Sequence, residues 1–98
     1  MYDSKLKNPE TDRLFEAILA LKDEEECYKF FDDICTVKEI HDIAQRLEVA
    51  SLLKKGETVA VIALKTGTST TTVSRVNRCL HYGSGGYNMI LDRIGTDE

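Results

Sequence analysis

The sequence contains no tryptophan, a single proline and only six glycines among its 98 residues. This scarcity of chain breakers, with 42% apolar and 31% charged residues, argues against a disordered or collagen-like chain and favours an ordered, helix-rich one. No apolar run approaches the roughly eighteen residues of a membrane span, and the first residues, MYDS, lack the basic-then-apolar pattern of a secretory signal. We therefore expect one folded domain over residues 1–98, located in the cytoplasm without membrane contact.

Residues that bind metals or carry out catalysis are also sparse. Cys27, Cys35 and Cys79 are odd in number and form no Cys-x-x-Cys pair, so we predict reduced thiols packed as small apolar side chains, with no disulfide and no zinc. His41 and His81 have no acidic or thiol partner at ligand spacing. Because no nucleophile, base and orienting group share a recognisable spacing, we predict no catalytic residues, no metal site and no resident cofactor.

The formal net charge of −4 is unevenly distributed along the chain. Residues 1–53 carry 13 acidic and 7 basic side chains, residues 54–82 carry 5 basic and 1 acidic, and residues 83–98 carry 3 acidic and 1 basic. A basic segment inside an acidic protein suits a DNA-contacting face, because only that face must neutralise phosphates. A solvated basic helix face accounts equally well for the charge alone.

Apolar residues recur at helical spacing in six segments, and no segment reads as a strand. The predicted helices cover residues 9–22, 24–34, 37–55, 59–65, 69–82 and 87–94. Asn8-Pro9 is typical of a helix start, and Thr36 with Glu39 forms the pattern of a capping box. The fold class is therefore all-α.

The predicted helix over residues 37–55 is apolar on two sides, which usually means burial on both sides. One face consists of Ile40, Ile43, Ala44, Leu47 and Ala50, and the other of Val49, Leu52 and Leu53. A 98-residue monomer has a modest core, so we expect a second copy to cover one of these faces. The sequence thus predicts a homodimer with this helix at its centre.

A helix-turn-helix is predicted over about residues 59–80, from the segment IALKTGTSTTTVSR at residues 62–75. Ala63 is small enough for the crossing of two helices. Gly67 suits a left-handed turn that is costly for other residues. Ser69 can cap the second helix, although its β-branched first turn has low intrinsic helix propensity. Ile62, Val73 and Val76 are expected to face a shared core.

The second helix of this motif presents hydroxyl and arginine side chains in the manner of a helix that enters the major groove. The candidate DNA-binding residues are Thr68, Ser69, Thr70, Thr71, Thr72, Ser74, Arg75 and Arg78. Arginines can pair with guanine or phosphate, and threonine methyls can contact thymine. An ordinary helical hairpin would account for Gly67 but would leave this polar helix without a purpose. We therefore predict double-stranded DNA as a partner.

At this level of detail the chain resembles the Trp repressor superfamily, and within it the YerC/YecD-type Trp-repressor-related proteins. The resemblance covers about residues 15–94 and is strongest in CTVKEI (35–40), AQRLEVA (44–50), TVSRVNRCL (72–80) and YGSGGY (82–87). It implies a six-helix subunit, an intertwined homodimer, and a transcriptional regulator, in the first instance a repressor. The alternative is a protein-interaction adaptor of the same fold that has lost DNA binding.

The resemblance also suggests an effector site. In the Trp repressor, the indole of the corepressor lies between two arginines that match Arg46 and Arg75. Val76 replaces the glycine that makes space for this indole, and apolar pocket positions fall near Asp33 and Cys35. A different small-molecule corepressor therefore stays an open alternative, while these departures argue against tryptophan as the corepressor.

Overall fold

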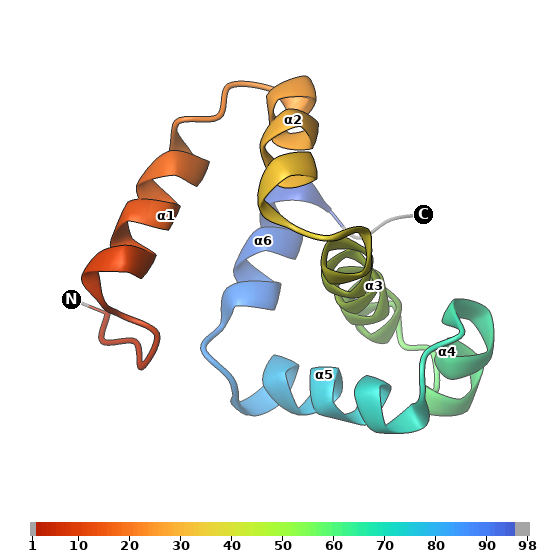
Figure 1. The fold of residues 1–98 in the computed structure, drawn as a ribbon. Coiled ribbons are helices and arrows are strands. Elements are labelled where there is room, and N and C mark those ends of the chain that lie inside the picture. The colour runs from red at the N-terminus through yellow and green to blue at the C-terminus, as the bar shows by residue number, and fades with distance from the viewer. Residues whose placement is uncertain (1, 96–98) are drawn as a thin grey trace. The chain divides into compact units, whose positions relative to one another are not determined.

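The computed structural model describes residues 2–95, which contain six α-helices and no strand (Figure 1). The helices are α1 (Pro9–Leu19), α2 (Glu24–Ile34), α3 (Val37–Lys54), α4 (Val59–Thr66), α5 (Thr70–Tyr82) and α6 (Gly86–Ile94). The all-α, six-helix prediction is confirmed. No helix among these residues is long and apolar enough to cross a membrane. Contacts divide the chain into two compact units, Met1–Val37 and Lys38–Glu98.

The first unit contains α1 and α2. The Asn8 side chain caps α1 by accepting from the Thr11 amide at 2.7 Å, and α2 begins after Asp23, which accepts from the Glu26 amide at 2.9 Å. Helix α1 ends earlier than residue 22, the end predicted from its apolar pattern. The reason is local, because the Lys22 amide donates to the Glu26 carboxylate at 2.9 Å and so belongs to the start of α2.

No residue of α1 or α2 is buried, although both helices are amphipathic. Their large apolar side chains remain accessible: Phe15 is 48%, Leu19 84%, Tyr28 66% and Ile34 48% exposed. A groove between the two helices is lined by further apolar groups, including Leu14, Ala17, Ala20 and Phe30. The first unit therefore carries apolar faces that the chain itself leaves uncovered.

The second unit has a core to which every one of its helices contributes. Its buried apolar residues are Val49, Ala50 and Leu52 of α3, Ile62 of α4, Val73 and Val76 of α5, and Leu91 of α6. Partly buried side chains surround them, including Leu47, Ala63, Leu80 and Tyr87. This core fixes α4 and α5 to α3, and α5 to α6.

Helix α3 is covered by its own chain only in its second half. All of its buried residues lie between Val49 and Leu52, whereas Ile43 is 48% exposed and Ile40 36% exposed. The helix ends where Gly56 adopts a left-handed conformation (φ +91°), with the Glu57 amide donating to the Leu52 carbonyl at 3.2 Å. The prediction of two apolar faces is thus refined, because one face is buried within the chain and part of the other is open.

The cysteines are free thiols, but their predicted packing is wrong for two of them. Cys27 and Cys79 are exposed, and Cys35 is half-buried. Cys27 stands in the first turn of α2, a helix that buries no residue in this chain, so there is no core to receive its thiol.

Candidate nucleic-acid interface

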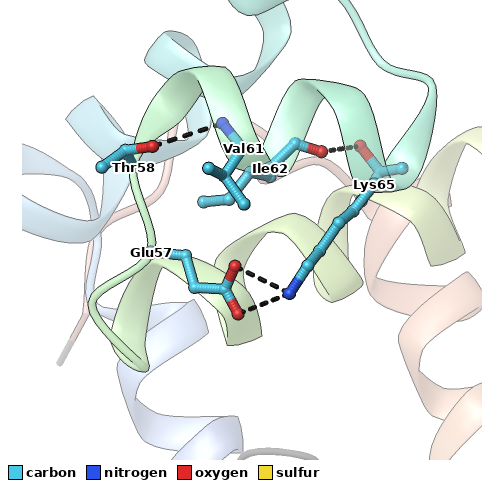
Figure 2. A network of polar contacts seen from close by, with 6 residues as sticks. Glu57, Thr58, Val61, Ile62 and Lys65 are labelled. Atoms are coloured by element: carbon cyan, nitrogen blue, oxygen red, sulfur yellow. Dashed lines mark hydrogen bonds and ion pairs between the residues drawn. The ribbon is translucent and has the colours of Figure 1, made fainter.

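Helix α4 is fixed at its start by a threonine cap and a neighbouring ion pair (Figure 2). The Thr58 hydroxyl accepts from the Val61 amide at 3.2 Å, as the sequence predicts. Both oxygens of Glu57 accept from the Lys65 ammonium at 2.9 Å, which joins the residue before the cap to the last turn. These contacts place Ile62 in the core with no exposed surface.

The turn between α4 and α5 depends on the backbone conformation of Gly67. Its φ of +73° lies in the left-handed region, and its amide donates to the Ala63 carbonyl at 2.9 Å. A Cβ built on Gly67 would meet no atom within 4 Å, so glycine is favoured here by conformation rather than by space. The predicted position of the turn is confirmed.

Thr66, which sequence reasoning missed, organises the same turn. Its hydroxyl donates to the Ile62 carbonyl at 2.7 Å, contacts the Thr68 hydroxyl, and lies 3.3 Å from the Thr68 amide that donates to it. A threonine in the last turn of a helix, just before a glycine, is a weak signal for such local bonds. The consequence is that the Thr68 hydroxyl is engaged within the turn.

Ser69 caps α5 as predicted, and its side chain accepts from the Thr72 amide at 3.1 Å. The Ser69 and Thr72 hydroxyls also lie 3.1 Å apart. Val73 is fully buried and Val76 is 2% exposed. Burial of these two valines and the cap together offset the low helix propensity of the first turn.

The face of α5 that points away from the core carries most of the predicted site. The exposed members of the set are Ser69, Thr70, Thr71, Ser74, Arg75 and Arg78. Thr68 and Thr72 are half-buried, and each has its hydroxyl in contact with a neighbouring hydroxyl. The helix-turn-helix geometry therefore presents six of the eight residues to solvent on one helix and its cap.

The basic side chains near this motif differ in whether they already have a polar partner within the chain. Lys65 is paired with Glu57, whose side chain is only 25% exposed, and Lys54 donates to the Asn88 side chain at 2.8 Å. Within residues 2–95, Arg75 and Arg78 take part in no ion pair. The two arginines of α5 are thus available to an anionic partner.

Arg46 lines a cavity of about 460 Å³ beside the connector between α5 and α6. The other lining residues are Ile43, Leu47, Cys79, Ser84, Gly85, Gly86, Tyr87 and Ile90, and Arg75 is not among them. Burial raises the pKa of the Tyr87 phenol, against the opposing effect of the Arg46 charge. Within the chain, the two predicted effector residues are therefore not brought together in this cavity.

The chain is similar to known proteins over most of its length. The family model described as Trp repressor protein matches residues 9–95. YerC of Bacillus subtilis (strain 168), described as uncharacterized, is 55% identical over 98 residues, covering 100% of this chain and 94% of that protein.

Two solved structures have the same fold. A TrpR-like protein from Eubacterium eligens ATCC 27750 is 51% identical with a TM-score of 0.90, covering 96% of this chain and 97% of that one. A protein from Staphylococcus aureus, whose crystal structure is provisionally described as that of a Trp repressor, is 52% identical with a TM-score of 0.88. The match covers 95% of this chain and 93% of that one.

Proposed function

This chain belongs to the Trp repressor family, a family of DNA-binding regulators, and we propose that it is a sequence-specific transcriptional repressor that reads double-stranded DNA with α5. The observation that carries the proposal is the solvent-facing row of hydroxyls and unpaired arginines on the second helix of a helix-turn-helix. A major groove about 12 Å wide accepts one helix with its side chains directed at the base edges.

The geometry supports different roles for the hydroxyls and the arginines of α5. The exposed hydroxyls of Thr70, Thr71 and Ser74 lie in its first half, the part that approaches base edges when such a helix enters the groove. Arg75 and Arg78 follow one helical turn apart, so both can reach phosphates or guanines from the same side. A positive helix N-terminus adds to the attraction for phosphate.

The proposal is tested by replacing each arginine with alanine and measuring the fluorescence anisotropy of labelled genomic duplexes over a series of salt concentrations. If Arg75→Ala or Arg78→Ala removes a base contact, affinity falls by about 1–3 kcal/mol with relaxed specificity at one position. If it removes a phosphate contact, the salt slope falls by about one. Arg93 is an exposed arginine on α6, and Arg93→Ala is the matched control. We expect this variant to keep the wild-type DNA affinity and the wild-type salt slope.

Wild-type affinity in both α5 variants would contradict the assignment of α5 as the reading helix. Failure of the wild type to bind any genomic duplex, even at low salt, would favour the adaptor that has lost DNA binding. The salt series separates these results from weak, sequence-independent attraction.

We also propose that the working form is a symmetric, intertwined homodimer. This is supported by the uncovered apolar residues of α1 and α2 and by the exposed Ile40 and Ile43 in the first half of α3. Covering them with a second copy removes apolar surface from water at about 25 cal/mol per Å². In such a dimer, residues 1–98 act as the single domain that the sequence predicts.

A small-molecule effector is proposed for the cavity beside Arg46. Its apolar side chains and one guanidinium suit an apolar molecule with a carboxylate. A library of such acids, screened for a rise in thermal stability, should give binders whose effect is lost in Arg46→Ala. Binders unaffected by that change would place the effector elsewhere.

A further inference from the structure

Two side-chain amides bond backbone carbonyls on either side of the reading-helix segment, one at the end of α4 before the turn and one near the end of α5. At the N-terminal end, Gln45 Nε2 of α3 donates to the Thr66 carbonyl at 2.8 Å, just before the turn that leads into α5. At the C-terminal end, Asn88 Nδ2 of α6 donates to the Leu80 carbonyl at 3.0 Å. All four residues are half-buried, so these bonds are partly shielded from water.

The two carbonyls belong to helix ends, where backbone acceptors lack helical partners. Thr66 is the last residue of α4, and Leu80 lies in the last turn of α5, where the final helical bond runs from the Gly83 amide to the Cys79 carbonyl, one residue before Leu80. The amides of Gln45 and Asn88 therefore satisfy acceptors that the helices leave open. They differ from helix caps because their partners are 21 and 8 residues away in sequence and lie on other elements.

The Asn88 amide is itself oriented by Lys54. The Lys54 ammonium donates to Asn88 Oδ1 at 2.8 Å, and a lysine can only donate. Oδ1 must therefore face α3, which directs Nδ2 toward the Leu80 carbonyl. The chain of bonds from Lys54 through Asn88 to Leu80 connects α3, α6 and α5.

Both connections lead back to α3. Gln45 and Lys54 are nine residues apart on that helix, or about 14 Å at 1.5 Å per residue. We propose that Gln45 and Asn88 are positioning residues for DNA readout, which tie the start of the α4–α5 turn and the C-terminal end of α5 to α3 at two separated points. The inference rests on the proposed function of α5 as the reading helix.

The apolar packing of α5 shows why hydrogen bonds are needed to fix its orientation. Val73 and Val76 in the first half of α5 and Leu80 near its end pack against the core, but apolar packing is not directional and leaves the helix some freedom to tilt. Hydrogen bonds at both ends resist that tilt. Base contacts need side chains held to within roughly half an ångström, which is finer than burial alone provides.

The first test uses amide hydrogen exchange without DNA. Gln45→Met and Asn88→Leu remove one donor each at nearly constant volume. We expect exchange to rise roughly fivefold at the Gly67 and Thr68 amides in Gln45→Met, and at the Gly83 amide in Asn88→Leu. Unchanged exchange at both ends would overturn the proposal.

The second test measures the affinity of the same variants for the duplex that binds wild type best and for an unrelated duplex, at a temperature where all variants are fully folded. A bond that only adds stability leaves the dissociation constants unchanged there. Positioning residues instead lower the specific affinity roughly five- to tenfold and reduce the specificity ratio, with the salt slope unchanged because no phosphate contact is lost.

The control is Asn8→Ala, which removes the side-chain oxygen that accepts a hydrogen bond from the Thr11 amide in the first unit. Its specificity ratio should equal that of the wild type, and an equal loss in this control would overturn the proposal. If wild type binds no duplex, the proposed function fails, and the exchange experiment alone decides whether the amides hold α5. If one variant does not fold, the other still tests its own end of the helix.

Discussion

The two units of this chain are both built from helices with apolar side chains at helical spacing, but only the second unit buries such side chains. Helices α1 and α2 bury none of their residues, and Leu19 remains 84% exposed. In the second unit, seven apolar side chains from four helices form a core in which Ile62 and Val73 have no exposed surface. The same apolar periodicity thus specifies a helix in both units, but a packed core only where neighbouring helices converge.

The units also differ in charge. Residues 1–37 carry ten acidic and five basic side chains, whereas residues 38–95 carry five acidic and eight basic ones. The open apolar faces of the first unit suit association with a partner surface, and a basic unit with its own core suits DNA.

The largest effect is expected from the core of the second unit. Ile62→Ala should cost about 2–5 kcal/mol of unfolding free energy, because a fully buried side chain is replaced by a cavity. Leu64→Ala on the same helix removes a side chain that is 86% exposed and should change stability by no more than about 0.5 kcal/mol. Chemical denaturation of both variants checks this, and equal losses would contradict the assigned core.

A slightly smaller effect is expected at the turn of the helix-turn-helix. Gly67→Val places a β-branched residue at φ +73° and should cost about 1–3 kcal/mol, with a loss of DNA affinity. Gly67→Asn should cost less, because asparagine tolerates this conformation better. Wild-type melting of the valine variant would show that the turn is not strained.

The first unit should respond through association rather than through its own stability. Leu19→Glu puts a charge on the exposed apolar face of α1 and should raise the dimer dissociation constant at least about tenfold. Glu16→Ala alters the charged face of the same helix, and its exposed pair with Arg13 contributes little. Sedimentation equilibrium measures both, and unchanged association of Leu19→Glu would remove α1 from the interface.

The smallest effect compares equivalent caps in the two units. Asn8→Ala and Ser69→Ala each remove one cap bond and should each cost about 1 kcal/mol. Only the serine change should weaken DNA binding, because Ser69 caps the reading helix. A similar loss of affinity in both would argue that the first unit also contacts DNA.

Most of the fold could be predicted from local patterns. The capping side chains of Asn8, Thr58 and Ser69 each bond an amide three residues ahead, so sequence spacing is enough to place them. The left-handed conformation of Gly67 depends on that one residue being glycine. The exposed arginines of α5 followed from the same periodicity that buried its valines. The end of α1 was misplaced because Lys22 is bonded forward to α2, a competition that apolar spacing does not record.

The remaining features depend on residues that meet only after folding. Nothing near Gln45 in the sequence indicates that its amide reaches Thr66, and nothing near Asn88 indicates its contact with Lys54. The pairing of Lys65 with Glu57 likewise removes a cation that charge counting assigned to the DNA-contacting segment. The exposure of the apolar faces of α1 and α2 is likewise not evident from their helical spacing, which is the same for covered and uncovered helices.

We propose that a symmetric dimer reads DNA with two copies of α5, and hydroxyl-radical footprinting on genomic fragments that bind the protein tests this proposal. We expect two protected half-sites related by a twofold axis, with centres about 34 Å, or one helical turn, apart. Protection weakened across both half-sites in Arg75→Ala would tie the footprint to α5. Protection of a single asymmetric site would contradict the symmetric dimer. The absence of any protection, at a protein concentration at which the chain is fully dimeric, would contradict DNA reading by α5.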